Sequence, residues 1–174
     1  MLILYHNYIK YTSRVTFKGG LMEYRRRSHS VYLLTYHIVF VTKYRKPVIT
    51  GEIGDFMKKH AFYLCQRFQG ELIAAETDMD HIHLLVSLPP QVCPADLVRT
   101  LKTQLSKEVH LDPGYNAQVQ EYLKGDVPLW SPSYFIATTG SSVMEKVKEY
   151  INVQRTDGHK RKYEKSGKYK KKDA

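Results

Sequence analysis

The amino-acid sequence predicts an α+β fold in which an antiparallel sheet carries amphipathic helices on one face. Short runs rich in Val, Ile, Tyr, Phe and Thr are typical of strands, and two longer stretches repeat apolar residues at helical spacing. The two kinds of segment alternate without the regular spacing of βαβ units, which favours α+β over a parallel α/β fold. The chain has 174 residues, 43% of them apolar, which is enough for one domain with a sizeable core.

The first core strand is predicted over residues 31–41, where β-branched and aromatic residues are concentrated. Residues 1–29 show no convincing period, contain a Gly-Gly pair and end in a cluster of three arginines. We therefore expect residues 1–29 to form a peripheral N-terminal extension. The main domain is expected to cover residues 30–156.

Two amphipathic helices are predicted to pack on the sheet. Residues 52–68 repeat Ile53, Phe56, Met57, Leu64 and Phe68 near helical spacing, with most charged residues elsewhere. The second helix begins near Pro94, a favourable residue for a first helical turn, and its apolar stripe continues to Val109. The Asp-Pro-Gly sequence at 112–114 is expected to end it.

Three further strands and a last helix complete the prediction. Residues 72–76 and 81–88 are apolar runs separated by a polar stretch that favours a turn, so they indicate a hairpin or neighbouring strands. Residues 134–138 form another candidate strand. Ser142 and Glu145 then have the spacing of a capping box, which predicts a final helix that carries Tyr150 and Gln154.

The charge of the chain favours a polyanionic partner. Lys and Arg number 27 against 17 Asp and Glu, a formal net charge of +10. Nucleic acid is the leading candidate and a membrane surface the weaker one, although a basic protein without such a partner stays open. Residues 157–174 are expected to form a mobile basic tail, because they are dominated by Lys and have almost no aliphatic residues. Its candidate DNA contacts are Lys160, Arg161, Lys162, Lys170, Lys171 and Lys172.

Two cysteines, Cys65 and Cys93, are too few for a disulfide framework and lack the spacing of a zinc or redox site. No apolar run approaches the length of a membrane span or of a signal-peptide core. We therefore expect reduced cysteines and a cytoplasmic protein without a membrane partner.

The sequence Asp80-His81-Ile82-His83-Leu84-Leu85-Val86 carries the first candidate for chemistry. In a strand, side chains alternate between faces, so His81 and His83 would stand on one face and Ile82 on the other. Two neighbouring imidazoles suit a metal ion. The alternative is two half-buried histidines bonded to backbone or water, and the pair alone does not decide between them.

The last predicted helix carries the second candidate. Tyr150 and Gln154 are one helical turn apart, separated by only about 40° around the helix axis, so they share a face. Val143 and Val147 lie on the same face. Taken alone, this pattern favours an ordinary core aromatic and a polar residue at the helix boundary.

In combination, these motifs resemble a known family. They are the sequence from Tyr36 to Arg45 (Tyr-His-Ile-Val-Phe-Val-Thr-Lys-Tyr-Arg), the His-Ile-His motif, the run from Trp130 to Phe135, and Tyr150-x-x-x-Gln154. Together they resemble the HUH-superfamily single-tyrosine transposases of small insertion sequences, whose relatives include the REP-associated tyrosine transposases. The resemblance covers residues 30–156 and rests on the order and spacing of the motifs.

This resemblance implies a ferredoxin/RRM-like HUH sandwich and a transposase that cuts and rejoins single-stranded DNA through a 5′-phosphotyrosine. It implies that Tyr150 attacks the scissile phosphate and that His81, His83 and Gln154 bind a divalent ion, magnesium or manganese. It also implies a hairpin-bearing DNA substrate and a homodimer with active sites that can be shared between subunits. Two imidazoles suit manganese better than magnesium, so the metal stays open, as does the group that accepts the Tyr150 proton.

The sequence leaves three functions open. An active transposase would move its own insertion sequence, whereas a domesticated relative would use the same chemistry on repeated palindromes. A noncatalytic nucleic-acid binder would use the sheet, the tail and the tyrosines as a stacking surface, but it leaves the two catalytic motifs unexplained. His37 lies outside the His-Ile-His motif and is assigned a structural role.

Overall fold

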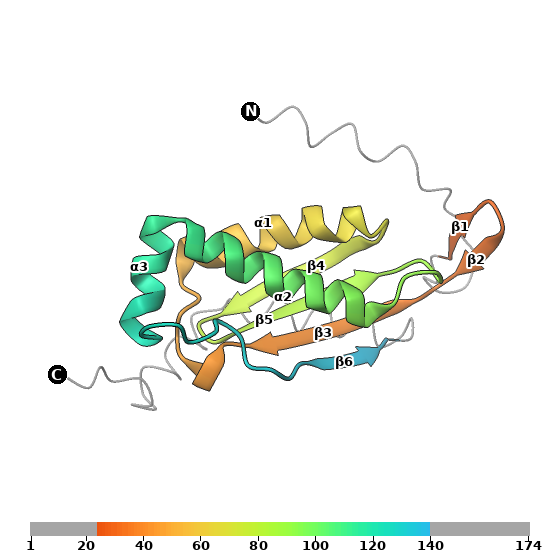
Figure 1. Ribbon diagram of the computed structural model, residues 1–174. Helices are drawn as coiled ribbons and strands as arrows, with labels where there is room; N and C mark the ends of the chain where they lie inside the picture. The colour runs from red at the N-terminus through yellow and green to blue at the C-terminus, as the bar shows by residue number, and fades with distance from the viewer. Residues whose placement is uncertain (1–23, 140–174) are drawn as a thin grey trace.

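The computed structural model describes residues 24–139, and the segments 1–23 and 140–174 lie outside the described part. The described elements are β1 (Arg25–Arg27), β2 (Ser30–Tyr32), β3 (Thr35–Val41), a short 3-10 turn (Lys43–Arg45), α1 (Gly51–Arg67), β4 (Glu71–Asp78), β5 (His81–Ser87), α2 (Pro94–Leu111), α3 (Pro113–Tyr122) and β6 (Phe135–Thr138). α1 and α2 lie along one face of the main sheet, and α3 lies beyond one of its ends (Figure 1).

The main sheet has the strand order β4-β5-β3-β6, and all three pairings are antiparallel. With α1 between β3 and β4 and α2 between β5 and β6, this is the βαββαβ connectivity of ferredoxin-like folds, with α3 added before the last strand. The predicted α+β fold is therefore confirmed. β3 and β5 form the centre of the sheet, so a side chain on either strand has neighbours on both sides.

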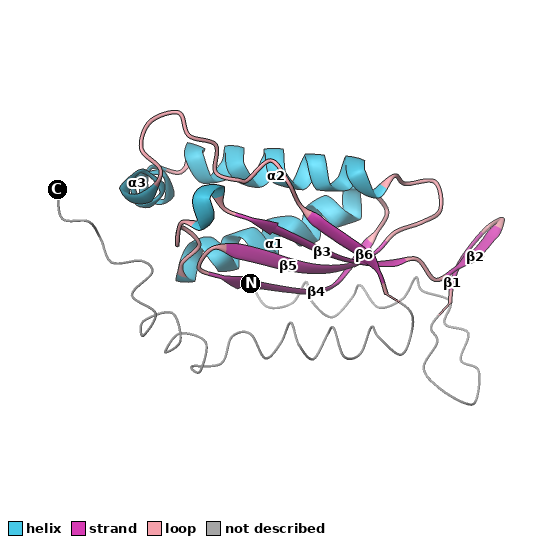
Figure 2. Ribbon diagram, turned by 90° about the horizontal axis from the view of Figure 1, so that it is seen from below, coloured by secondary structure: helices cyan, strands magenta, loops and turns pink. Residues whose placement is uncertain are grey.

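The hydrophobic core lies between the sheet and the helices. Alternate residues of the central strands, including Ile38 and Phe40 on β3 and Ile82 and Leu84 on β5, point into it and are buried. The helices supply the predicted stripes, with Met57 on α1 among the buried residues. Figure 2 shows the sheet and helices as two layers, with β1 and β2 projecting beyond one end.

Most predicted elements are present with small shifts at their ends. The helix predicted at 52–68 is α1, and the helix predicted from Pro94 is α2, which ends at Leu111 just before the Asp-Pro-Gly sequence. The predicted hairpin is formed by β4 and β5, and the strand predicted at 134–138 is β6. The last predicted helix lies outside the described residues.

The start of the domain differs from the prediction in how its strand is divided. The single strand predicted over 31–41 is in fact two strands, β2 and β3, because the chain pairs first with β1 and only then enters the main sheet. The arginine cluster, at the end of the segment predicted to be peripheral, forms strand β1 of a hairpin with β2 that projects beyond the main sheet (Figure 2). Its side chains contact the segment that enters β4. Arg25 forms an ion pair with Glu71, and Arg27 donates hydrogen bonds to Gln69.

The sequence analysis also missed α3. The Asp-Pro-Gly sequence ends α2 as expected, but it starts a new helix at once. Asp112 caps that helix by accepting a hydrogen bond from the Tyr115 backbone N–H, and Pro113 occupies its first turn. The Asp-Pro-Gly sequence thus ends α2 and begins α3.

Side chains and backbone groups fasten the connection from α3 to β6 to the domain. Trp130 packs edge-on against Phe40, with ring centroids 4.8 Å apart. The Lys102 ammonium on α2 donates to the carbonyls of Ser131 and Pro132, at 2.6 and 2.9 Å. These contacts fix the path of the chain into β6, which lies beside the histidine-bearing face of β3.

Candidate metal centre

Three histidines lie together on the sheet face that points away from the helical core. His81 and His83 alternate with the buried Ile82 and Leu84 on β5, as the strand period predicted. In the register of β3 and β5, His81 pairs with Val41 and His83 with Val39. The His81 and His83 rings have centroids 4.8 Å apart and are inclined by 74°. The structure therefore places the predicted pair side by side.

His81 is oriented by the residue before it. Its Nδ1 lies 2.5 Å from Oδ1 of Asp80, whose side chain is only 1% exposed, and the Arg45 Nε lies 3.7 Å from the other carboxylate oxygen. A buried carboxylate favours the tautomer in which Nδ1 donates, and this leaves the lone pair on Nε2. Histidines that bind metals are usually held in this way, with one nitrogen donating to a carboxylate and the other facing the ion.

His83 has a different partner, His37 of the neighbouring strand. Nε2 of His37 lies 3.0 Å from Nδ1 of His83, and the two rings are nearly parallel, 5.3 Å apart between centroids. Phe135 on β6 packs edge-on against the other side of His37, at 5.8 Å. The sequence analysis gave His37 only a structural role, but in the structure it contacts a predicted metal ligand directly.

The environment keeps the imidazoles of His83 and His37 neutral. The pKa of His83 is lowered to about 3, first because burial disfavours the charged ring and then because His81 and His37 lie beside it. Burial also lowers the pKa of His37. A neutral imidazole has a lone pair to offer, whereas a protonated one has none, so His83 can bind a cation without having to lose a proton first.

Two acidic residues of β4 lie beside the histidines, although an ion pair with Lys58 of α1 offsets the charge of Glu76. Asp78 pairs with His81 and Glu76 pairs with His83 in the register of β4 and β5. The Oδ2 atom of Asp78 is buried and has no hydrogen-bond partner within the described part of the chain. A divalent cation nearby would offset the negative charge of this buried oxygen. Both the charge of the site and its imidazole donors therefore fit a metal ion.

The predicted site is only partly within the described residues. Between residues 24 and 139 no three His, Cys, Asp or Glu side chains are arranged to hold an ion. The predicted third ligand, Gln154, and the predicted nucleophile, Tyr150, lie outside this range. The tail candidates Lys160, Arg161, Lys162, Lys170, Lys171 and Lys172 also lie outside it.

The chain thus combines an antiparallel sheet of ferredoxin-like order with a histidine pair carried by a central strand. Over residues 30–154, the chain matches the family described as "Transposase IS200 like". Since the match covers well over half of the 174 residues, the chain belongs to this family of transposases.

Individual relatives agree with the family. The chain is 33% identical to the ISDra2 transposase TnpA of Deinococcus radiodurans over 133 residues, which are 76% of this chain and 92% of that protein. It is 28% identical to the IS200 transposase of Salmonella typhimurium over 134 residues, 73% of this chain and 80% of that protein.

Solved structures support the fold. A crystal structure described as that of a transposase from Deinococcus radiodurans is 27% identical, has a TM-score of 0.55, and covers 75% of this chain and 97% of its own. A REP-associated tyrosine transposase is 18% identical, with a TM-score of 0.51 and coverage of 77% and 72% respectively, and this likeness concerns the fold alone.

Other expectations can be checked on the described residues. Cys65 and Cys93 are both free thiols, the first buried and the second exposed. No helix within residues 24–139 is long and apolar enough to cross a membrane.

Sequence reasoning missed the partners of the two histidines. Asp80 was visible as the residue before His81, and the carboxylate-histidine pairing of metal sites could have singled it out. His37 could not be assigned in the same way, because its contact with His83 depends on the pairing of β3 with β5, two strands that are far apart in the sequence.

Proposed function

We propose that the protein is a metal-dependent single-strand DNA endonuclease and strand transferase that acts at hairpin-marked insertion-sequence ends. The observation that carries the proposal is the arrangement of His81 and His83, two buried or half-buried imidazoles whose Nδ1 atoms are both engaged by neighbouring side chains. In a chain of the IS200-like family, such a pair suits the binding of an ion that handles a phosphodiester.

In this proposal His81, His83 and Gln154 hold magnesium or manganese, with the Asp78 carboxylate adding negative charge nearby. When bound, the ion neutralises charge on a phosphate oxygen and orients the ester. Asp80 and His37 hold the two imidazoles in position and set which nitrogen bears the lone pair. Two nitrogen donors favour manganese over magnesium unless water and phosphate oxygens complete the coordination sphere.

Tyr150 supplies the nucleophile. Its phenol oxygen bonds to the phosphorus while the bond to the 3′ oxygen breaks, so the DNA leaves with a free 3′-hydroxyl and the tyrosine keeps the 5′-phosphate. A phenol has a pKa of about 10, so holding it as phenolate at pH 7 costs about 4 kcal/mol unless the site helps. Attack by another 3′-hydroxyl reverses the step, which joins strands without a nucleotide cofactor.

The expected substrate and assembly follow the family. The REP-associated tyrosine transposase above was solved bound to a REP hairpin, which favours a hairpin-bearing substrate for this chain as well. The net charge of +10 suits a polyanion. The same relative favours, as the second candidate function, a domesticated enzyme that acts on repeated palindromes. The DNA that flanks the coding region separates the two, because only an active element has its own ends there.

A covalent adduct tests the chemistry. The full chain is incubated with 5′- and 3′-labelled single strands from the flanking DNA, with manganese or with a chelator, and the products are separated under denaturing conditions. Wild type should form a protein-DNA adduct only with metal, while Tyr150→Phe should form none and bind the same strand within a few fold of wild type. Tyr63→Phe, a change at an exposed tyrosine of α1, is the matched control. An adduct in Tyr150→Phe, or a metal-independent adduct, would contradict the proposal.

We further propose a homodimer with active sites shared between subunits. Tyr150→Phe and His81→Ala are mixed and allowed to exchange subunits. In a shared arrangement, one composite site per mixed dimer has both an intact tyrosine and an intact histidine pair, so cleavage should return although each variant alone is inactive. Background cleavage in confirmed mixed dimers would show that each subunit builds its own site.

A further inference from the structure

The turn that follows β3 has an unfavourable backbone. Tyr44 has φ 57° and ψ 20°, and Arg45 has φ 52°, so two successive residues with side chains adopt the left-handed conformation. Steric contacts of Cβ with the following carbonyl disfavour this conformation for residues other than glycine. Within residues 24–139, Gln69 is the one other residue besides glycine with a positive φ.

The surrounding structure holds the turn in place. The backbone N–H and the hydroxyl of Thr42 both donate to the carbonyl of Asp80, at 2.8 and 3.2 Å, and the hydroxyl also lies 2.7 Å from the Lys46 carbonyl. The Lys43 N–H donates to the Leu129 carbonyl at 2.8 Å. Strained residues persist where neighbouring contacts over-determine them, and such positions are concentrated at functional sites.

The turn exposes an aromatic ring to solvent, with basic side chains on either side of it. Tyr44 is 70% exposed, the largest exposed fraction among the large apolar and aromatic residues of the described part. The Lys43 ammonium lies 5.1 Å from the centre of its ring. The Arg45 side chain is half exposed, and Lys46 follows it, so every charged residue of the turn is basic.

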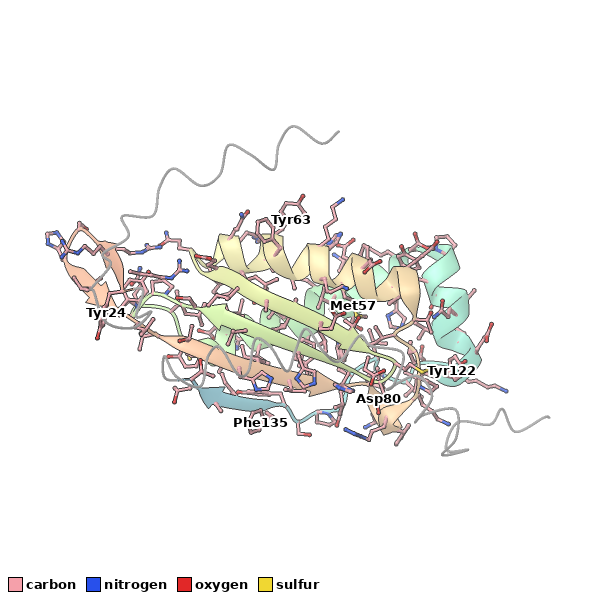
Figure 3. All side chains as sticks on the ribbon, turned by 180° about the vertical axis from the view of Figure 1, so that it is seen from behind. Tyr24, Met57, Tyr63, Asp80, Tyr122 and Phe135 are labelled. Carbon is pink, nitrogen blue, oxygen red and sulfur yellow. The ribbon has the colours of Figure 1, made fainter. Side chains whose placement is uncertain are left out.

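The turn is also coupled to the candidate metal centre. Arg45 Nε lies 3.7 Å from the Asp80 carboxylate, and the same carboxylate contacts Nδ1 of His81. Asp80 lies at the end of the main sheet that is remote from the β1–β2 hairpin (Figure 3). The exposed ring is therefore presented from a fixed position at the end of the sheet where the candidate site begins.

We propose that the Lys43–Arg45 turn binds a nucleotide of single-stranded DNA beside the cleaved bond, with its base stacked on Tyr44 and its phosphates near Lys43 and Arg45. Single-stranded DNA is polyanionic, and its bases have flat apolar faces. A fixed, exposed ring flanked by cations therefore suits it. Only an unpaired base offers such a face, since base pairs in a duplex cover theirs. This inference rests on the proposed function, because it assigns a binding site to the same single-stranded substrate.

The test compares binding of a labelled oligothymidylate and an abasic strand of the same length, by fluorescence anisotropy with the full chain. Tyr44→Ala should weaken binding of oligothymidylate by about tenfold, as for loss of one stacked base, whereas Tyr44→Trp should keep it. On the abasic strand, wild type and Tyr44→Ala should bind equally. Tyr63→Ala, which removes an exposed tyrosine from the outer side of α1 (Figure 3), is the matched control and should bind as wild type does.

A second variant separates stacking from folding. Tyr44→Gly removes the ring and also relieves the left-handed conformation, so its Tm should equal or exceed that of wild type while its affinity for oligothymidylate falls as in Tyr44→Ala. Wild-type affinity in both variants would overturn the inference while the proposed function stands. Equal loss on the abasic strand would also overturn it, because stacking requires a base. Failure of wild type to bind either strand would overturn this inference alone, because the proposed function is decided by the adduct assay on hairpin-bearing strands.

Discussion

His37 on β3 and His83 on β5 are joined by a contact of 3.0 Å between Nε2 of the first ring and Nδ1 of the second. One of the two nitrogens must donate, and the buried environment keeps both rings neutral. If His37 accepts, His83 has its proton on Nδ1 and its lone pair on Nε2. The contact then orients the His83 ring as Asp80 orients that of His81, so each of the two predicted histidine ligands has its own partner.

The first prediction concerns this contact. His37→Phe keeps an aromatic ring between His83 and Phe135 but removes the nitrogen, so His83 loses the group that sets its tautomer. Manganese affinity, measured by titration calorimetry or by the EPR signal of free ion, should fall by about 10- to 100-fold, the usual effect of losing such a partner. His60→Phe on α1 is the control. Unchanged affinity in His37→Phe would return His37 to a purely structural role.

Asp80 gives the second prediction. Asp80→Ala removes the carboxylate that contacts His81 and leaves the Arg45 guanidinium without it, and manganese affinity should again fall by about 10- to 100-fold. Asp80→Asn keeps an oxygen that can accept from Nδ1 and should lose less. An equal loss in both variants would mean that charge, rather than orientation of the ring, is what Asp80 contributes.

The sequence could predict what depends on local pattern. Strand period placed His81 and His83 on one face, and helical period located α1 and α2, because burial on one side imposes these periods directly. The sequence could not predict contacts that depend on strand pairing, such as the His37–His83 contact. The split of residues 31–41 was missed for the same reason, since nothing local shows that β2 pairs with β1 rather than with β5.

The two cysteines give a third prediction. Burial raises the pKa of the Cys65 thiol to about 12, so at pH 8 it stays protonated and shielded, whereas Cys93 is exposed. A thiolate-specific reagent should therefore modify only Cys93 in the native protein, and Cys65 as well after denaturation. Cys93→Ser should abolish the native reaction. Rapid native labelling of Cys65, read by peptide mass spectrometry, would contradict its burial.

The basic tail gives a fourth prediction. Deleting residues 158–174 should weaken binding of a single strand and flatten its dependence on salt, because each lost phosphate contact removes about 0.7 from the slope of log affinity against log salt. Replacing Lys170, Lys171 and Lys172 by Gln tests one end of the tail without changing its length. An unchanged slope in both variants would show that the tail makes no phosphate contacts.

The last prediction concerns the packing of α1 on β4, the strand that brings Asp78 to the histidine face. A Cβ on Gly54 would lie 2.5 Å from Oγ1 of Thr77, which is too close for any real contact, whereas one on Gly51 would meet nothing within 4 Å. Gly54→Ala should therefore destabilise the fold by about 1–3 kcal/mol through overpacking, offset in part by the roughly 1 kcal/mol that Ala gains over Gly inside a helix.

The sign of this effect should depend on Thr77. In a Thr77→Ala background the obstructing hydroxyl is gone, so Gly54→Ala should become neutral or stabilising, while Gly51→Ala should behave alike in both backgrounds. Denaturant unfolding of wild type, of Thr77→Ala, and of Gly54→Ala and Gly51→Ala in both backgrounds measures the coupling. If Gly54→Ala has the same effect with and without the Thr77 side chain, the close approach of α1 to β4 at this point is not what requires a glycine at position 54.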